Sequence, residues 1–348
     1  MKREQQIGLI VLAVILTGAV AGSLLYFSQI QDKETLVIST TTSLFDTGLL
    51  DEVKTVYEES HTQVILAFIS AGTGIAITHA MNGDADAILV HSPSQEFDFM
   101  NQSYGVNRKI IAYNFFVVVG PSDDPAGISG MNTTTALQQI YDYGQSHGTS
   151  LWISRDDSSG TNSKEISLWT QTGLDYETIK EESWFLSSGS GMGTTLQTAD
   201  ELGLYTLADI GTYLKYFSDG LITLAKHVES DQTLINVYSA IAVNATKVEG
   251  VKFDLAMEFI EWLVGAGAQD LIGAYGQEDY GQALFNPAAS IVQSQTPADV
   301  YDWIETTAYF DFGGTLYECP PSWRTGDYGL YHPLIEMFYI SSRTEWIQ

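Results

Sequence analysis

Hydrophobic and polar residues alternate along the chain in stretches typical of short buried strands and amphipathic helices. Residues 35–39 and 63–70 have the apolar character of buried strands, and 46–60 places its apolar residues on one helical face. A short helix is expected at 71–81 and a further strand at 86–90. Because strands and helices alternate in this order, we expect an α/β fold with a parallel, doubly wound sheet.

Two long apolar runs, 110–120 and 236–244, bracket a second series of strands and helices. This arrangement predicts that the chain leaves a first lobe along the first run and returns along the second. A ligand would then bind between two doubly wound lobes, at the carboxyl ends of their strands. The expected divisions are an N-terminal segment (1–34), lobe one (35–118 and 240–290), lobe two (119–239) and a C-terminal extension (291–348). Further helices are expected near 134–146, 162–172, 253–264 and 268–275, and a strand at 151–154.

The N-terminal segment has the features of a membrane anchor. Lys2 and Arg3 precede an uncharged stretch from Ile7 to Phe27. At ~1.5 Å per residue this stretch reaches about 31 Å, which is enough to cross a bilayer. By the positive-inside rule the rest of the chain lies outside the cytoplasm. A cleaved signal peptide is the alternative, but the length of the apolar run favours a retained transmembrane helix.

Composition excludes several classes of protein. The chain has 348 residues, of which 45% are hydrophobic, and 15 Lys+Arg against 43 Asp+Glu give a net charge of −28. The hydrophobic content rules out disorder, and the acidic charge rules against a nucleic-acid binder. The single cysteine, Cys319, excludes an intrachain disulfide and a cysteine zinc site, and the histidines are scattered. We therefore expect neither a cofactor nor a metal.

Four turns between strands and helices are rich in glycine, serine and threonine. They lie at 39–43, 71–74, 154–161 and 188–195, and the third carries Arg155. Free amide groups and the helix dipole make such turns suitable for an anion, and a guanidinium matches the geometry of an oxyanion. Each turn taken alone is more often a helix cap or a tight turn. Arg155 could equally form a surface ion pair with its acidic neighbours. The occurrence of four such turns, one of them with Arg155, favours an anion site.

Known catalytic and nucleotide motifs do not fit the chain. It has no Walker A loop, and its glycine turns do not match the dinucleotide fingerprint or a nucleophile elbow. Asp84 and Asp86 could form an acid/base pair, although such residues more often solvate a turn. An enzyme on this fold and an acidic surface or adhesion protein without a small-anion ligand remain as alternatives of other classes.

Several strings resemble the tungstate-binding proteins of ABC transporters, which are relatives of molybdate- and phosphate-binding proteins. The resemblance covers about 36–288 and rests mainly on STTTSLFDTGLLDEV (39–53), AGTGIAITHAMNGDADAILVHSP (71–93), SRDDSSGTNSKEISLW (154–169) and SGMGTTLQTADE (190–201). It implies a two-lobed periplasmic-binding-protein fold of type II without catalytic activity. The protein would bind tungstate, or alternatively molybdate or phosphate, and deliver it to a membrane permease. We expect it to act as a monomer.

The same resemblance implies a set of ligand contacts. These are Thr41, Thr42, Thr73, Arg155, Ser159, Gly160, Thr161, Gly193 and Thr194. Asn162 stands where the family usually has His, and Ile210 where it usually has Arg, which leaves Arg155 as the only clear cation.

Tungstate carries no proton at neutral pH and needs only donors, whereas phosphate benefits from a carboxylate such as Asp156 or Asp86. The extension at 291–348 is rich in aromatic residues, and packing on lobe one is expected, with a surface for docking a partner as the alternative. Glycosylation triplets begin at Asn101, Asn132 and Asn244.

Overall fold

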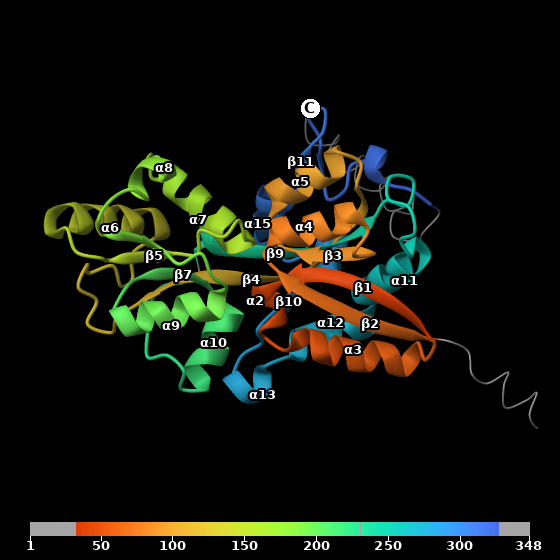
Figure 1. Ribbon diagram of the computed structural model, residues 1–348, viewed down its shortest axis with the longest axis horizontal. Helices are drawn as coiled ribbons and strands as arrows, with labels where there is room; N and C mark the ends of the chain where they lie inside the picture. The colour runs from red at the N-terminus through yellow and green to blue at the C-terminus, as the bar shows by residue number, and fades with distance from the viewer. Residues whose placement is uncertain (1–32, 230, 327–348) are drawn as a thin grey trace, which may run out of the picture.

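One long strand runs through both halves of the molecule. The computed structural model describes residues 33–229 and 231–326. Strand β4 (Gly105–Gly120) pairs through Phe115 with β9 (Ile235–Val243). Beyond that point its residues Phe116–Val119 pair with β7 (Thr206–Asp209). The half built around the first pairing is called lobe one below and the other half lobe two (Figure 1).

Lobe one contains a mixed sheet with the strand order β10-β4-β9-β3-β1-β2. Strand β1 (Glu34–Thr41) runs parallel to β2 (Val64–Ala71) and β3 (Ala87–Val90), as the alternation of strands and helices predicts. Strand β9 is antiparallel to both β3 and β4, and the short β10 (Asn286–Pro287) is antiparallel to β4. The predicted parallel order therefore holds for β1, β2 and β3, while β9 and β10 make the sheet mixed because each runs antiparallel to its neighbours.

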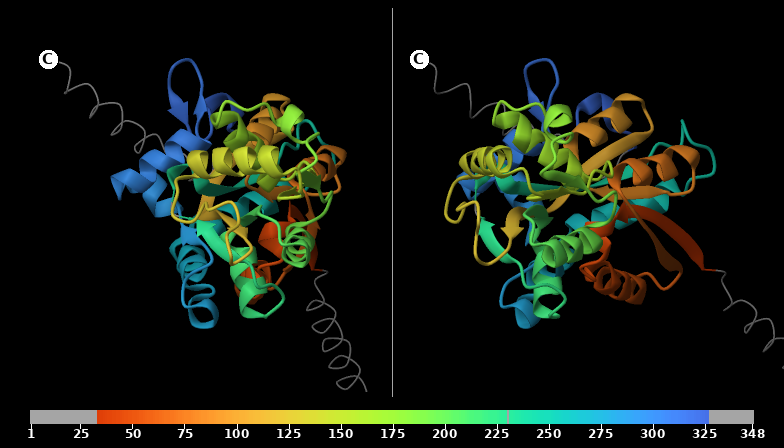
Figure 2. Two further views of the ribbon diagram at one scale, coloured as in Figure 1. Left: turned by 90° about the vertical axis from the view of Figure 1, so that its left-hand side faces the viewer. Right: turned by 60° about the vertical axis from the view of Figure 1, so that its left-hand side comes forward.

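Helices cover both faces of this sheet. The core on one face joins it to α3 (Leu49–Ser60), α11 (Phe253–Val264) and α12 (Ala266–Ala274). The core on the other face includes α4 (Thr73–Asn82) and α5 (Pro93–Asn101), as Figures 1 and 2 show. Leu36, Ile38 and Ile260 are completely buried. Burial of such side chains, each worth about 1.5–3 kcal/mol, holds the layers together.

Lobe two has a second mixed arrangement of strands. Strands β7 and β8 (Ala225–Val228) both pair antiparallel with the end of β4, while β5 (Trp152–Ser154) and β6 (Phe185–Ser187) form a parallel pair. A parallel bridge between Trp152 and Tyr205 places the start of β5 beside the start of β7. Its helices are α6 (Thr133–His147), α7 (Gly160–Gln171), α8 (Tyr176–Ile179), α9 (Met192–Leu202) and α10 (Ile210–Ser218). Its cores include three buried tryptophans, Trp152, Trp169 and Trp184.

The helix expected at 46–60 begins later than predicted. A one-turn helix, α2 (Thr42–Phe45), comes first, and α3 begins only at Leu49. Gly48 separates them with φ 87°, and a Cβ there would lie 2.7 Å from the Tyr275 hydroxyl oxygen. Because the left-handed region favours glycine, the break at Gly48 directs α2 away from α3.

The C-terminal extension contacts lobe one. Following α13 (Gln277–Tyr280), it forms α14 (Ala289–Ser294), α15 (Ala298–Ala308), the β11 (Phe310–Asp311) and β12 (Leu316–Tyr317) pair, and the turn Pro321–Trp323. Ile304 packs in one cluster with residues of β4 and β9, and Trp323 packs with those of α4 and α5. The Glu318 carboxylate accepts from the backbone N–H of Ile110 at 2.6 Å and from Lys109 Nζ at 2.7 Å. The extension thus binds directly to β4.

Two expectations concern residues outside the described ranges. The apolar segment at 7–27 and the final part of the extension, 327–348, are among them. Within 33–229 and 231–326, no helix is long and apolar enough to span a bilayer. The residue ranges of the domain divisions stay a prediction.

Candidate functional site

The four polar turns lie together, two from each lobe. They form the starts of α2, α4, α7 and α9, whose N-caps are Thr41, Gly72, Ser159 and Gly191. A Cβ on Gly72 would lie 3.4 Å from the Asp157 carbonyl oxygen, and one on Gly191 would lie 3.8 Å from Thr42 Oγ1. Turns that are more than 80 residues apart in sequence therefore face each other across the boundary between the lobes.

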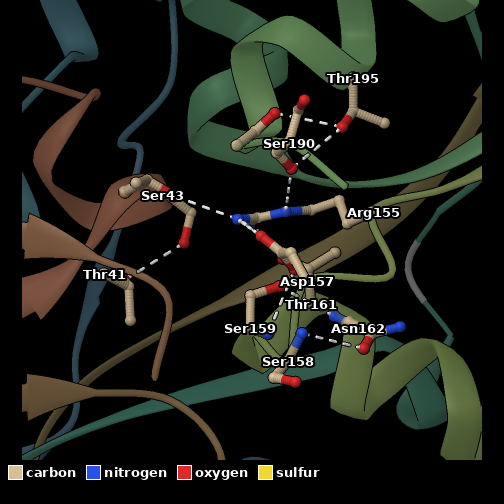
Figure 3. Close-up of polar contacts among 12 residues, drawn as sticks. Thr41, Ser43, Arg155, Asp157, Ser158, Ser159, Thr161, Asn162, Ser190 and Thr195 are labelled. Carbon is tan, nitrogen blue, oxygen red and sulfur yellow. Dashed lines mark hydrogen bonds and ion pairs between the residues drawn. The ribbon is translucent and has the colours of Figure 1, made fainter. Parts of the chain in front are cut away.

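Arg155 lies at the point where these turns meet. Its side chain follows β5 and is almost completely buried, with 2% of the residue exposed. Nη2 donates to Thr42 Oγ1 of lobe one at 3.1 Å, while Nε donates to the Ser190 carbonyl at 3.3 Å and Nη1 to Thr161 Oγ1 at 3.4 Å (Figure 3). The guanidinium thus connects three of the four turns. The bonds to Ser190 and Thr161 are longer than an ordinary N–H···O bond, and a charged oxygen accepts shorter and stronger bonds from a guanidinium.

Asp157 is the charged partner of Arg155. Its Oδ2 lies 2.6 Å from Arg155 Nη2, and its Oδ1 accepts from the backbone N–H of Ser159 at 3.2 Å (Figure 3). The pair is not on the surface, since the Arg155 side chain is only 1% exposed. The alternative of a surface ion pair is therefore wrong for Asp157. Asp156 pairs with another cation: its Oδ1 lies 3.8 Å from Nζ of Lys180, the residue that follows α8.

The lobe-one residues predicted for the site are buried beside this pair. Thr41 Oγ1 caps α2 by accepting from the N–H of Leu44 at 3.3 Å. Thr73, the first residue of α4, is completely buried, and its hydroxyl has no hydrogen-bond partner among the described residues. A buried hydroxyl without a partner costs about 1–3 kcal/mol. Thr73 is therefore suited to a ligand that supplies an acceptor.

The lobe-two residues predicted for the site divide into two groups. Ser159 caps α7 by accepting from the N–H of Asn162, and Gly160 and Thr161 follow it in the buried first turn. Gly193 is covered by Tyr216, whose hydroxyl would lie 1.9 Å from a Cβ at this position. The side chain of Thr194 is exposed. The fourth turn approaches Arg155 through Ser190 rather than through Gly193 or Thr194.

His91 belongs to the same site, although the sequence analysis did not select it. It follows β3, and its Nδ1 lies 2.8 Å from Asn236 Oδ1 and its Nε2 3.0 Å from Ser43 Oγ. Burial lowers the pKa of His91 to about 4, so the ring is neutral at pH 7. Since Asn236 presents a carbonyl oxygen, Nδ1 carries the proton and Nε2 accepts from Ser43. The sequence feature that could have identified His91 is its position at the carboxyl end of a strand in the lobe-one sheet.

The His91 ring touches lobe two at Gly160. A Cβ on Gly160 would lie 2.7 Å from Cε1 and 2.8 Å from Nδ1 of the ring. A ring so close to the start of α7 is possible only because residue 160 has no side chain. His91 and Gly160 therefore form a tight contact between the lobes beside Arg155.

Other hydrogen bonds join the lobes on both sides of Arg155. Gln95 on α5 donates to the Ser158 carbonyl at 3.2 Å and to Ser163 Oγ at 2.8 Å. On the other side, Thr212 Oγ1 donates to the Ser43 carbonyl at 3.3 Å. The structure thus shows the lobes in direct contact around the predicted site.

The crossing strands carry a buried polar cluster next to the site. Asn114 on β4 and Asn236 on β9 both donate to Asp209 Oδ2, at 2.9 and 3.0 Å. Burial raises the pKa of the Asp209 carboxyl, which also caps α10 through the N–H groups of Gly211 and Thr212. Because Asn236 also binds His91, this cluster connects the strands between the lobes to the site.

Two residues considered for other roles lie elsewhere. Asp86 accepts from the backbone N–H groups of Val37 and Lys252, both at 2.8 Å, so it fixes strands rather than acting as an acid/base pair with Asp84. Ile210 begins α10 and is buried. Within the described part of the chain, no group of three or more His, Cys, Asp or Glu is placed to hold a metal ion.

Comparison with known proteins agrees with this architecture. The family model described as a PBP superfamily domain matches residues 28–266. A Haloferax volcanii protein, assigned as the anion-binding protein of an ABC transporter, is 42% identical over 73% of this chain and 72% of its own length. The tungstate-binding protein TupA of Peptoclostridium acidaminophilum is 38% identical over 80% of this chain and 95% of its own.

Solved structures show the same similarity. The tungstate-binding protein TupA from Desulfovibrio alaskensis G20 has 38% identity and a TM-score of 0.61, over 73% of this chain and 98% of that one. The tungstate ABC transporter structure from Geobacter sulfurreducens has 37% identity and a TM-score of 0.62, over 70% of this chain and 99% of that one.

The fold and the anion-suited turns define a binding protein of the PBP superfamily. Within that superfamily, the chain belongs to the family of the tungstate-binding proteins of ABC transporters.

Proposed function

We propose that the chain is the substrate-binding subunit of an ABC transporter and that it binds tungstate between its lobes. Its role is to bind and deliver the ligand, with no catalytic step, as expected for its family. The observation that supports the ligand class most directly is the meeting of Arg155 with polar turns from both lobes. Thr41, Thr42, Thr73, Ser159, Gly160 and Thr161 would supply the other donors, with Gly193 and Thr194 at the edge of the fourth turn.

Donors of this kind are sufficient for tight binding. A hydrogen bond to a charged group contributes about 1.5–3 kcal/mol. Six such bonds give a gross contribution of the order that nanomolar binding requires, about 12 kcal/mol, before the cost of closing the lobes. The buried hydroxyl of Thr73 makes its bond without losing an existing partner. Ligand binding therefore stabilises the closed arrangement, since the donors come from both lobes.

One observation favours phosphate as a second candidate. Asp157 places a carboxylate at the Arg155 guanidinium, and a carboxylate can accept the proton that phosphate retains at neutral pH. Both oxygens of Asp157 are already engaged, one by Arg155 and the other by the N–H of Ser159. This arrangement leaves less acceptor capacity for a proton on the ligand, and it supports tungstate or molybdate as the first choice.

The site would lie outside the cytoplasm. The apolar segment at 7–27, preceded by Lys2 and Arg3, would anchor the chain in the membrane by one N-terminal pass. The permease of the transporter is the expected protein partner, and the binding subunit would act as a monomer. An anchor of this kind keeps the binding lobes close to the permease.

Calorimetric titration tests the proposal. The purified chain is titrated with tungstate, molybdate, sulfate and phosphate in separate experiments at constant ionic strength. We expect the tightest binding for tungstate, with one site per chain. Absence of binding to all four anions would contradict the proposed function, and a preference for phosphate would establish the second candidate.

A further inference from the structure

The loop that carries Arg155 has an unfavourable backbone conformation. Between β5 and α7, Asp156 and Ser158 have positive φ angles of 43° and 57°. Neither residue is glycine, so each of these conformations is energetically unfavourable. The loop therefore depends on contacts with the surrounding structure to present Arg155, Asp157 and Ser159 in their observed positions.

A buried hydrogen-bond network supplies these contacts, and it begins at Glu165. This residue lies on α7 with 2% of its surface exposed. Its Oε1 accepts from Trp152 Nε1 at 2.7 Å, and its Oε2 accepts from Ser154 Oγ at 2.6 Å. In this arrangement the proton of the Ser154 hydroxyl points to the buried Glu165 side chain.

The direction of this bond determines the next ones. A serine hydroxyl has a single proton, so Ser154 Oγ acts as an acceptor toward its other neighbours. It accepts from the backbone N–H of Asp156 at 3.1 Å and lies 3.0 Å from the Tyr176 hydroxyl. Tyr176 in turn accepts from Asn162 Nδ2 at 3.2 Å.

Asn162 completes the network at the second unfavourable residue. Its Oδ1 accepts from the backbone N–H of Ser158 at 3.3 Å (Figure 3). The N–H groups of both positive-φ residues, Asp156 and Ser158, are therefore held by side chains that connect to Glu165. The amide of Asn162 serves both ends because it donates to Tyr176 and accepts from Ser158.

We propose that Glu165 is a positioning residue of the anion site, which acts through Ser154, Tyr176 and Asn162 to hold the 155–159 loop in its binding conformation. This inference rests on the proposed function. Loss of the network would let Asp156 and Ser158 relax toward ordinary φ values. The Arg155 guanidinium and the N–H of Ser159 would then move away from the anion.

The loop also forms contacts between the lobes, which adds to the expected effect. The Ser158 carbonyl accepts from the N–H of Gly74 at 3.4 Å and from Gln95 at 3.2 Å, and both donors belong to lobe one. A relaxed loop would weaken the closed arrangement together with the direct anion contacts. Affinity should therefore respond more strongly than the stability of lobe two.

Tungstate titration of the full chain, with thermal unfolding measured in parallel, tests the inference. Glu165→Ala removes both acceptors, and we expect tungstate affinity to fall by tenfold or more. Glu165→Gln keeps the size of the side chain and one acceptor, so it should restore part of the affinity. Tyr176→Phe removes only the link between Ser154 and Asn162, and a reduction of about threefold to tenfold is expected.

Leu137→Ala serves as the destabilised control. Leu137 is buried in the core of lobe two on α6 and takes part in none of the hydrogen bonds of the network, and its truncation lowers stability by leaving a cavity. We expect its melting temperature to fall and its affinity at 25 °C to stay within twofold of the unmodified chain.

The outcomes separate this inference from the proposed function. If the unmodified chain binds none of the four anions, the proposed function fails. If it binds tungstate and both Glu165→Ala and Tyr176→Phe keep that affinity within twofold, the inference alone is overturned. It is also overturned if Leu137→Ala loses as much affinity as the network variants. If Glu165→Ala does not fold, the tungstate affinities of Tyr176→Phe and Glu165→Gln test the inference in its place.

Discussion

Replacement of Gly160 by Ala should separate lobe closure from folding. Gly160 is the first residue of α7 in lobe two, and the His91 ring of lobe one lies against it. A Cβ on this residue would lie 2.7–2.9 Å from three atoms of the ring. Real contacts of this kind need about 3.4 Å or more, so one of the two groups must move.

The ring has little freedom to move away. Ser43 and Asn236 hold its two nitrogens at 3.0 and 2.8 Å, and Tyr238 is stacked on it with ring centroids 4.8 Å apart. The added methyl group should therefore keep the lobes apart rather than displace His91. Overpacking of a rigid contact typically costs about 1–3 kcal/mol, which corresponds to a loss of affinity between about 5-fold and about 140-fold.

Stability without ligand should behave in the opposite way. The backbone at Gly160 does not have a positive φ, so alanine can adopt it, and alanine in a helix is favoured over glycine by about 0.5–1 kcal/mol. We expect an unchanged or slightly higher melting temperature for Gly160→Ala in the absence of anion. Loss of affinity without loss of stability would identify the substitution as a block to closure.

A matched control is available at Gly191. A Cβ there would meet Thr42 at 3.8–3.9 Å, which is ordinary contact, and the position also lies at the start of a helix facing the other lobe. Calorimetry with tungstate should give a Gly191→Ala affinity within threefold of the unmodified chain. Small-angle scattering should show a liganded Gly160→Ala chain that is less compact than the liganded control. An unchanged affinity for Gly160→Ala would refute the reasoning.

Three further predictions concern single side chains of the site. Arg155→Ala should weaken tungstate binding more than tenfold in the same titration, because it removes the cation and leaves Asp157 unpaired beside the anion; equal affinity would place Arg155 outside the site. Thr73→Val should raise stability in chemical unfolding by about 1 kcal/mol, since it removes an unpaired buried hydroxyl, and should lower affinity by roughly 10-fold to 100-fold. A lower stability for Thr73→Val would contradict this account. For His91, burial lowers the pKa from 6.5 to about 4, so the neutral form is favoured in the folded chain, and its stabilising contribution is complete above pH 6.5 and lost as the pH falls toward 4. Unfolding followed between pH 7 and 4 should therefore show a weaker pH dependence in His91→Gln than in the unmodified chain.

Elements with a strong local pattern were predictable from the sequence. The amphipathic run at 253–264 forms α11 (Phe253–Val264), and the helix expected at 134–146 forms α6 (Thr133–His147). The direction of β9 was not predictable, because it depends on the lobe from which the chain enters this strand. The start of β4 was also missed, since Arg108 and Lys109 do not resemble strand residues. Arg108 is buried in an ion pair with Glu96 at 2.8 Å, and no local pattern reveals such a partner.

The same limit applies to the site. The polar turns could be found because each combines its own donors with a helix start. His91 was not selected, because its contacts depend on Asn236, which lies 145 residues away in the chain, and only its position after a strand marks it locally. Asp157 was considered only as a surface partner of Arg155. The pair lies away from the surface because lobe one covers Arg155, and that contact cannot be seen in the local sequence. Residues whose role depends on contacts between the two lobes therefore cannot be identified from their local sequence alone.

The carboxylate of Glu318 also covers part of an edge of the lobe-one sheet. Strand β10 pairs with β4 only at Ala112 and Tyr113, so among residues 33–229 and 231–326 the neighbouring stretch of β4 has no strand beside it on that side. Glu318 occupies this place by binding the N–H of Ile110, and its negative charge is unfavourable to an incoming foreign strand. A chain shortened before residue 318 would expose this stretch as a template for pairing with another molecule. Self-association on storage, rather than altered anion affinity, would be the first sign of such a truncation.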